Sequence, residues 1–211
     1  MKKVSALLIF IFVLGIEMTG WTQEKFSYDS LEVSEARWSL LKKTGGFLGG
    51  LVTGFVFHEL GHETMARFDG ANITWSAGSD YIKGTTHNYS EASLRRIELA
   101  GFGAQIISTE TLLFFEGIPK DNAFVLGWLG YNVISTFTYI LSDQLLSPDG
   151  VGDFKSLRTQ AGVSRGDVNL LQLGLVAHAA LTTYRVFKNP KIKPYISATG
   201  REIVIGVGWS W

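Results

Sequence analysis

Residues 44–62 read TGGFLGGLVTGFVFHELGH, an apolar run that ends in the motif His58-Glu59-Leu60-Gly61-His62. Its first part, residues 44–57, contains no charged residue. On an α-helix, residues four apart lie on one face, so the imidazoles of His58 and His62 can reach a single metal ion. Glu59 lies beside them, where its carboxylate can take a proton from water at the metal. The sequence therefore predicts a zinc-hydrolase type of site on a helix that lies within a membrane.

Glycines recur along this predicted helix at four-residue spacing, as Gly46, Gly50 and Gly54. In a soluble helix each glycine would reduce helix stability by about 1 kcal/mol relative to alanine. In lipid, stripes of small residues let helices approach closely, and packing rather than hydrophobicity drives their association. The glycine pattern therefore favours a membrane helix that packs tightly against a neighbour.

The composition limits the classes of function. The chain has 211 residues, 46% of them hydrophobic and 18% charged, against roughly 25% charged in soluble domains. Lysine plus arginine equals aspartate plus glutamate at 19 each, and no basic patch interleaved with aromatic residues is present. Nucleic-acid binding is therefore not expected. Because the chain has no cysteine, any metal must be held by histidine and carboxylate side chains.

The N-terminus has the pattern of an export signal. Lys2 and Lys3 precede an apolar stretch from Val4 to Ile16. A basic start followed by such a stretch is typical of a signal peptide or signal anchor, so residues 1–22 are expected to be one of the two, with a possible cleavage ahead of Gln23.

Four long apolar segments follow, and spanning a bilayer takes roughly 20 mostly apolar residues. Residues 23–43 are polar and mixed in charge, with a short interfacial helix predicted at 34–43. We expect a mainly α, polytopic transmembrane bundle over residues 44–190, in a multi-pass integral protein of a bacterial cytoplasmic membrane. The predicted helices cover residues 43–68, 92–116, 122–146 and 167–187.

Two short β-hairpins are predicted outside the helices. Residues 69–90 contain short apolar runs separated by Gly70, Gly78 and Gly84, which is typical of turns and strands. Residues 191–211 form a C-terminal segment in which larger apolar residues alternate with smaller ones around a turn at Gly200. The sequence thus places one hairpin after the HExxH helix and one at the C-terminus.

A catalytic zinc keeps three protein ligands and an open position. Without cysteine, the third ligand must be histidine, aspartate or glutamate. Asp153, just before a short helix predicted at 154–160, is the first candidate, and Asp149 in Pro-Asp-Gly is the second. Each could equally be a turn or helix-cap aspartate. The topology places both at the same end of the bundle as His58 and His62.

Other polar residues have plainer interpretations. Asp167 is predicted as the N-cap of the last helix, and His178, far along that helix, as a packed or helix-bridging histidine. His87 is expected to be solvated. Glu63 could orient a metal ligand, or could equally be a solvated residue at the helix end.

The chain resembles the site-2 protease family of intramembrane zinc metalloproteases. The resemblance rests on HELGH at residues 58–62 in a membrane helix, a following hairpin segment, the small-residue segment 100–105 (AGFGAQ), and a later Asp-Gly at 149–150. The family has a Gly-Pro-x-x-Asn type of motif in the next helix and a Leu-Asp-Gly motif that supplies its third ligand. Here the helix segment lacks the proline and has Gln105 where asparagine is expected, and the later motif reads Ser-Pro-Asp-Gly.

The resemblance implies a zinc metallopeptidase that hydrolyses peptide bonds of membrane-associated protein or peptide substrates. His58, His62 and Asp153 would hold Zn²⁺, and Glu59 would be the general base. Gln105 could hydrogen-bond the substrate or pack within the bundle. Two other hypotheses stay open: a non-catalytic membrane metal-binding or scaffold protein, and a soluble or secreted zinc protease anchored only by its N-terminus.

Overall fold

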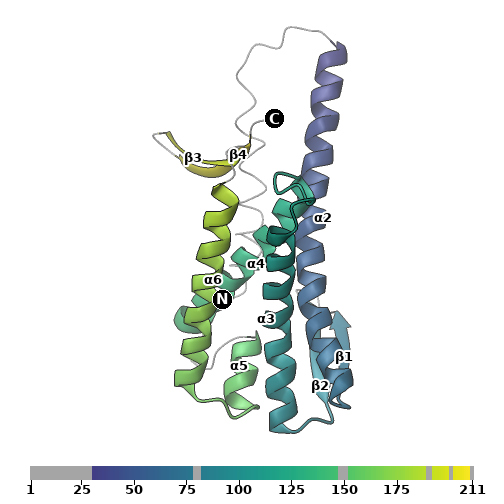
Figure 1. The fold of residues 1–211 in the computed structure, drawn as a ribbon, viewed down its shortest axis with the longest axis vertical. Coiled ribbons are helices and arrows are strands. Elements are labelled where there is room, and N and C mark those ends of the chain that lie inside the picture. The colour runs from purple at the N-terminus through teal and green to yellow at the C-terminus, as the bar shows by residue number, and fades with distance from the viewer. Residues whose placement is uncertain (1–29, 78–81, 147–151, 189–191, 200–201, 210–211) are drawn as a thin grey trace.

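The computed structural model describes residues 30–77, 82–146, 152–188, 192–199 and 202–209. The signal segment predicted at residues 1–22 lies outside these ranges. The described chain is mainly helical, as predicted, with two small two-stranded sheets. In Figure 1, α2, α3 and α6 run along the long axis, and α5 lies at the same end of the molecule as the β1–β2 hairpin.

The first described helix, α2 (Ser30–Phe68), is a single helix of 39 residues that carries the HELGH motif near its end. The separate interfacial helix predicted at 34–43 is therefore wrong, because it is continuous with the motif helix. No proline or glycine interrupts residues 30–44, so nothing in this stretch breaks the hydrogen-bond ladder.

Four glycines of α2 mark where α4 (Ala123–Leu141) packs against it: Gly46, Gly49, Gly50 and Gly54. A Cβ added at Gly50 would lie 2.0 Å from the carbonyl oxygen of Phe124, and one added at Gly127 would lie 2.0 Å from the carbonyl oxygen of Phe47. The two backbones therefore approach too closely for any side chain at these positions. This close approach was predicted from the glycine spacing, and it fixes α4 against the half of α2 that precedes the motif.

The remaining helices match their predicted positions to within a few residues. α3 (Glu91–Phe114) begins at the N-cap Ser90, and α4 is followed by a π-helical turn, η1 (Ser142–Leu146). The short α5 (Gly152–Thr159) follows, and then α6 (Arg165–Phe187). One apolar cluster joins α3, α5 and α6 through buried side chains that include Leu94, Phe102, Phe154, Leu157, Val168 and Leu175.

The start of α6 differs from the prediction. Ser164 is the N-cap, and its hydroxyl oxygen accepts a hydrogen bond from the backbone N–H of Asp167. Asp167 lies three residues further on and accepts from the Ser164 hydroxyl at 2.7 Å. Asp167 is therefore a first-turn residue that accepts from the cap hydroxyl, rather than the N-cap itself.

Both predicted hairpins are present. β1 (Asn72–Ala77) pairs antiparallel with β2 (Ile82–His87), directly after the motif helix. β3 (Ile192–Thr199) pairs antiparallel with β4 (Glu202–Trp209) at the C-terminal end of the chain. An ion pair between Arg96 and Asp69, at 2.9 Å, ties the start of α3 to the end of α2, and this hydrogen bonding lowers the pKa of Asp69.

Within the described residues, one helix, Ala123–Leu145, is long and apolar enough to cross a membrane. Four such helices were expected. α3 falls short because charged residues such as Arg95 and Glu98 interrupt its apolar sequence, and α6 because polar residues such as Asn169, Gln172 and Thr182 do so. The glycines of α2 contribute little apolar surface. Length and composition therefore identify a single candidate span.

Candidate metal centre

His58 and His62 lie on adjacent turns of α2, and their rings face each other. Their Nε2 atoms are 3.0 Å apart, and the rings meet edge to face with centroids 4.6 Å apart. Both residues are buried, with 1% and 6% of their surface exposed. The four-residue spacing thus produces two ring nitrogens directed at one point, on the protein-facing side of the helix.

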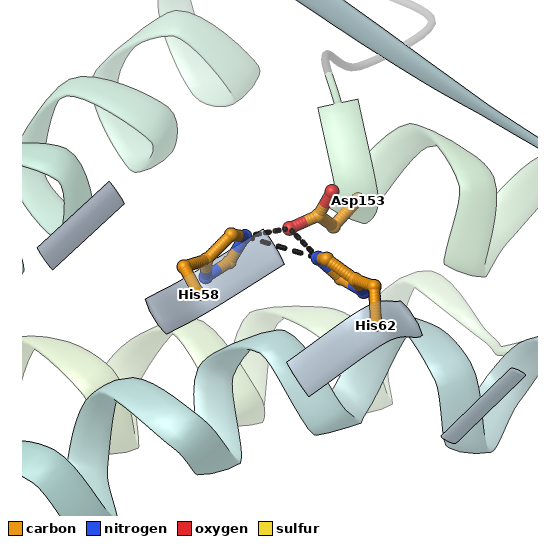
Figure 2. Close-up of side chains that lie close together, drawn as sticks. All are labelled: His58, His62 and Asp153. Atoms are coloured by element: carbon orange, nitrogen blue, oxygen red, sulfur yellow. Dashed lines mark hydrogen bonds and ion pairs between the residues drawn. The ribbon is translucent and has the colours of Figure 1, made fainter. Parts of the chain in front are cut away.

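Asp153, in the first turn of α5, completes this group (Figure 2). Its Oδ2 lies 3.1 Å from Nε2 of His58 and 3.5 Å from Nε2 of His62. The ligand atoms of the three residues all lie within 4.8 Å of one another. The structure therefore brings together the three residues that the sequence suggested as ligands, from segments 95 residues apart. Asp149, the second candidate, lies outside the described residues.

The dimensions of this triangle suit a zinc ion. Zinc binds imidazole nitrogen and carboxylate oxygen at about 2.0–2.2 Å, so the ligands of a tetrahedral site lie roughly 3.3–3.6 Å apart. The three distances of 3.0, 3.1 and 3.5 Å are close to that range. Two imidazoles and one carboxylate are also the donor set of several catalytic zinc sites, and they leave a fourth position open. The residues present therefore fit the ion.

A backbone carbonyl on α3 sets the orientation of His62. Its Nδ1 lies 2.8 Å from the carbonyl oxygen of Ile97. Because a carbonyl oxygen can only accept, Nδ1 must carry a proton, and Nε2 is the ring nitrogen that faces His58 and Asp153 and could bind a metal ion. Such an outer hydrogen bond is how metal-binding histidines are usually held in one tautomer. The ring of His58 is held by packing instead, edge-on to Phe102 with centroids 5.7 Å apart.

Gly101 on α3 provides the space that the two imidazoles occupy. A Cβ added there would lie 2.3 Å from Nε2 of His62 and 2.8 Å from Cε1 of His58. Gly61, inside the motif, lets α2 and α3 approach each other closely, since a Cβ there would lie 2.5 Å from the carbonyl oxygen of Ala100. The small residues of segment 100–105 thus let the α3 backbone form one wall of the site.

Stacking and a buried ion pair hold α5, and hence Asp153, in place. Phe154 is fully buried and stacks on Phe102, with ring centroids 5.0 Å apart and planes 14° from parallel. Arg158 makes a two-pronged ion pair with Asp143 of the π-helical turn, with one N–O distance of 2.8 Å. Gln172 on α6 also donates to Asp143, at 2.7 Å. Truncating a group in such a buried network is costly, so α5 is anchored rather than loosely attached.

The charge state of Asp153 follows from its neighbours. Burial acts to raise the pKa of its carboxyl, but hydrogen bonding to His58 and His62 outweighs burial and holds the pKa well below its usual range. Asp153 is therefore a carboxylate at neutral pH, as a metal ligand must be.

Glu59 is half-buried on α2, next to the histidines rather than among the ligands. Its carboxylate is close enough to His58, His62 and Asp153 to interact with all three electrostatically. A carboxylate beside the ligand triangle, but not part of it, has the position that a general base requires.

The other residues singled out from the sequence lie away from the triangle. Glu63 accepts from Arg67 at 2.8 Å and from Trp75 at 3.2 Å, so it ties the end of α2 to the hairpin. His87 is exposed at the end of β2. Neither residue contacts the ligands.

Two polar residues join helices. Gln105 is buried and donates to Ser135 of α4 at 2.9 Å, which is the bundle-packing role. His178 lies 3.1 Å from Glu110 of α3, which also accepts from Arg185 at 2.7 Å, so the prediction of a helix-bridging histidine is confirmed. The side-chain amide of Gln105 therefore hydrogen-bonds Ser135 of the neighbouring helix.

Sequence reasoning missed the parts of the site that come from α3. Ile97 contributes only a backbone carbonyl, for which no side-chain pattern exists. Glu98 and Ser156, which hydrogen-bond each other beside the ligands, have neither motif nor characteristic spacing. Gly101 was noticed as part of a small-residue segment, but its contact with the imidazoles depends on how α3 packs against α2.

No family model, curated protein or solved structure matches this chain.

Proposed function

We propose that this chain is a zinc metallopeptidase, similar to site-2 proteases, that hydrolyses peptide bonds of membrane-associated substrates. The observation that carries the proposal is the triangle of His58 Nε2, His62 Nε2 and Asp153 Oδ2, in which the Ile97 carbonyl fixes the ring of His62. These residues would hold the ion, and Glu59 lies beside them.

Each residue has a distinct part in such a reaction. A bound zinc ion would polarise the scissile carbonyl group and make nearby water acidic enough to lose a proton near neutral pH. Glu59 would accept that proton and later return it to the leaving amine. Asp153 offsets the positive charge at the centre, and the Ile97 carbonyl keeps His62 in the tautomer that ligation needs. Gly101 keeps α3 from displacing either imidazole.

Replacing Glu59 with glutamine tests the catalytic part of the proposal. The amide has nearly the same shape but cannot take a proton, so zinc content should stay at the wild-type level while hydrolysis falls by roughly 10²–10⁴-fold. A quenched fluorescent peptide with an apolar stretch, presented in detergent micelles, is a suitable probe.

Glu63→Gln is the matched control, because Glu63 lies one turn further along α2 and bonds to Arg67 and Trp75 instead. It should hydrolyse the peptide at the wild-type rate. Equal turnover by wild type and Glu59→Gln would contradict the assignment of the base. Zinc binding without turnover by the wild-type chain would favour the second candidate, a membrane metal-binding or scaffold protein, which the same ligand triangle supports.

We also propose that the bundle lies within a membrane, with Ala123–Leu145 as one span and the other long helices beside it. Support comes from the large apolar side chains left exposed on the outer faces of the helices, since soluble proteins rarely expose apolar surface on this scale. They include Val52, Val56 and Leu60 on α2, Ile107 and Phe114 on α3, Ile134, Phe137 and Leu141 on α4, and Leu170, Leu173 and Leu181 on α6. The charged groups Glu110 and Arg185 pair with each other, as charges in lipid must.

Extraction distinguishes this arrangement from a soluble protease tethered by its N-terminus. After removal of residues 1–22, the remaining chain should stay with membranes in alkaline carbonate and be released by detergent. Release by carbonate alone would show that the described helices are not embedded.

A further inference from the structure

A second carboxylate, Glu98, lies beside the candidate centre without being one of its ligands. It is buried on α3, directly after Ile97, whose carbonyl oxygen holds His62. Its Oε1 accepts a hydrogen bond from the hydroxyl of Ser156 at 2.5 Å. None of the roles proposed for the ligands and for Glu59 involves Glu98. Burying a carboxylate without a hydrogen-bond partner is costly, so the bond from Ser156 is what stabilises it there.

Ser156 belongs to the same helix as the third ligand. Asp153 and Ser156 are three residues apart on α5, so they lie on one face of that helix. The hydrogen bond to Glu98 therefore joins α5 to α3 on the face from which Asp153 reaches His58. A hydroxyl that donates to a buried carboxylate is a strong, charge-assisted contact.

We propose that Glu98 is a positioning residue that sets the place of Asp153 through Ser156. Two consecutive residues of α3 then orient two ligands from different helices: the Ile97 carbonyl orients His62, and the Glu98 carboxylate orients Asp153. Gly101, one turn later, leaves the space that the imidazoles of His62 and His58 occupy. This inference rests on the proposed zinc site. It adds the contact between Glu98 and Ser156 that would keep the Asp153 carboxylate in position.

Zinc affinity tests the proposal without any measurement of turnover. Ser156→Ala removes the hydroxyl, and the zinc dissociation constant should rise 10–100-fold, the usual effect of losing an outer hydrogen bond at a metal site. Ser156→Thr keeps the hydroxyl and should bind zinc as wild type does. Competition with a chelator gives the affinities, and visible absorption after Co²⁺ substitution reports whether the carboxylate still coordinates.

Two further variants separate positioning from general effects. Thr159→Ala is the matched control on α5, because the Thr159 hydroxyl bonds the Lys155 carbonyl of its own helix. It should leave affinity unchanged. Glu98→Gln keeps an oxygen that can accept from Ser156 but loses the charge, so its loss of affinity should be smaller than that of Ser156→Ala.

The positioning role would be overturned if Ser156→Ala bound zinc with wild-type affinity. It would also be overturned if Glu98→Gln lost more zinc affinity than Ser156→Ala. These outcomes differ from failure of the zinc site itself, which would appear as absence of zinc binding by the wild-type chain.

Discussion

Asp153→Ala is expected to weaken zinc binding roughly 10²–10³-fold and, with it, to reduce peptide hydrolysis strongly. Structural zinc sites with four protein ligands bind with roughly 10–16 kcal/mol, so one ligand contributes about 2.5–4 kcal/mol. Loss of that contribution corresponds to a roughly 10²–10³-fold weaker affinity. The Asp153 carboxylate is also the only one in the three-residue ligand group found among the described residues, so removal leaves two neutral imidazoles. Metal analysis of the purified variant, together with chelator competition, measures the effect.

Asp149→Ala and Lys155→Ala are the controls for this result. Asp149 is the other aspartate that the sequence suggested, and Lys155 is an exposed residue of α5. Both variants should retain zinc, because the third position of the triangle is taken by Asp153. If Asp149→Ala loses zinc while Asp153→Ala keeps it, the ligand assignment is wrong.

Gly101→Ala is expected to be nearly as damaging, although alanine is the smallest possible addition. Its Cβ would lie 2.3 Å from Nε2 of His62, well inside contact distance, so the ring or the α3 backbone must shift. We expect zinc affinity to fall at least 10–100-fold, since ligand geometry changes directly. Overpacking costs about 1–3 kcal/mol, partly offset by the better helix propensity of alanine. The fold should therefore persist while metal binding is lost, which circular dichroism and chelator competition can establish together.

Gly103→Ala is the matched control, two residues further along the same helix. No atom lies within 4 Å of a Cβ added there, so this variant should bind zinc normally and be slightly more stable. Equal zinc affinity in Gly101→Ala and Gly103→Ala would mean that α3 does not form the wall described here.

Much of the architecture could be predicted from local sequence. Apolar periodicity and turn residues identified the helices and both hairpins, since these signals depend on neighbours along the chain. The HELGH spacing predicted that His58 and His62 lie together as candidate ligands, because helix geometry alone places residues four apart on one face. The glycines of α2 identified a close helix contact, although not which helix would make it.

The features of the fold and of the candidate site that the sequence did not predict depend mostly on contacts between segments distant in sequence. α2 extends through residues 34–43 because no residue there breaks it, whereas polar composition had suggested a separate helix. Ser164 rather than Asp167 caps α6, and both residue types are good caps, so composition could not rank them. The support from Ile97 and Glu98 arises only when α3 lies against α2 and α5.

The number of membrane spans is the clearest difference between prediction and structure. Segments of suitable length were counted as spans, yet only Ala123–Leu145 of the described chain is also sufficiently apolar. Charged residues such as Glu98 and Glu110 reduce the apolar character of α3, and the structure gives both of them partners on other helices. Paired charges of this kind cannot be recognised before the packing is known.

X-ray absorption spectroscopy of the purified wild-type chain, with metal analysis of the same sample, tests the central claim most directly. The account predicts about one zinc ion per chain, bound by two imidazole nitrogens and at least one carboxylate oxygen at about 2.0–2.2 Å. A chain that binds no zinc when the ion is supplied, or binds it without imidazole, would contradict the account.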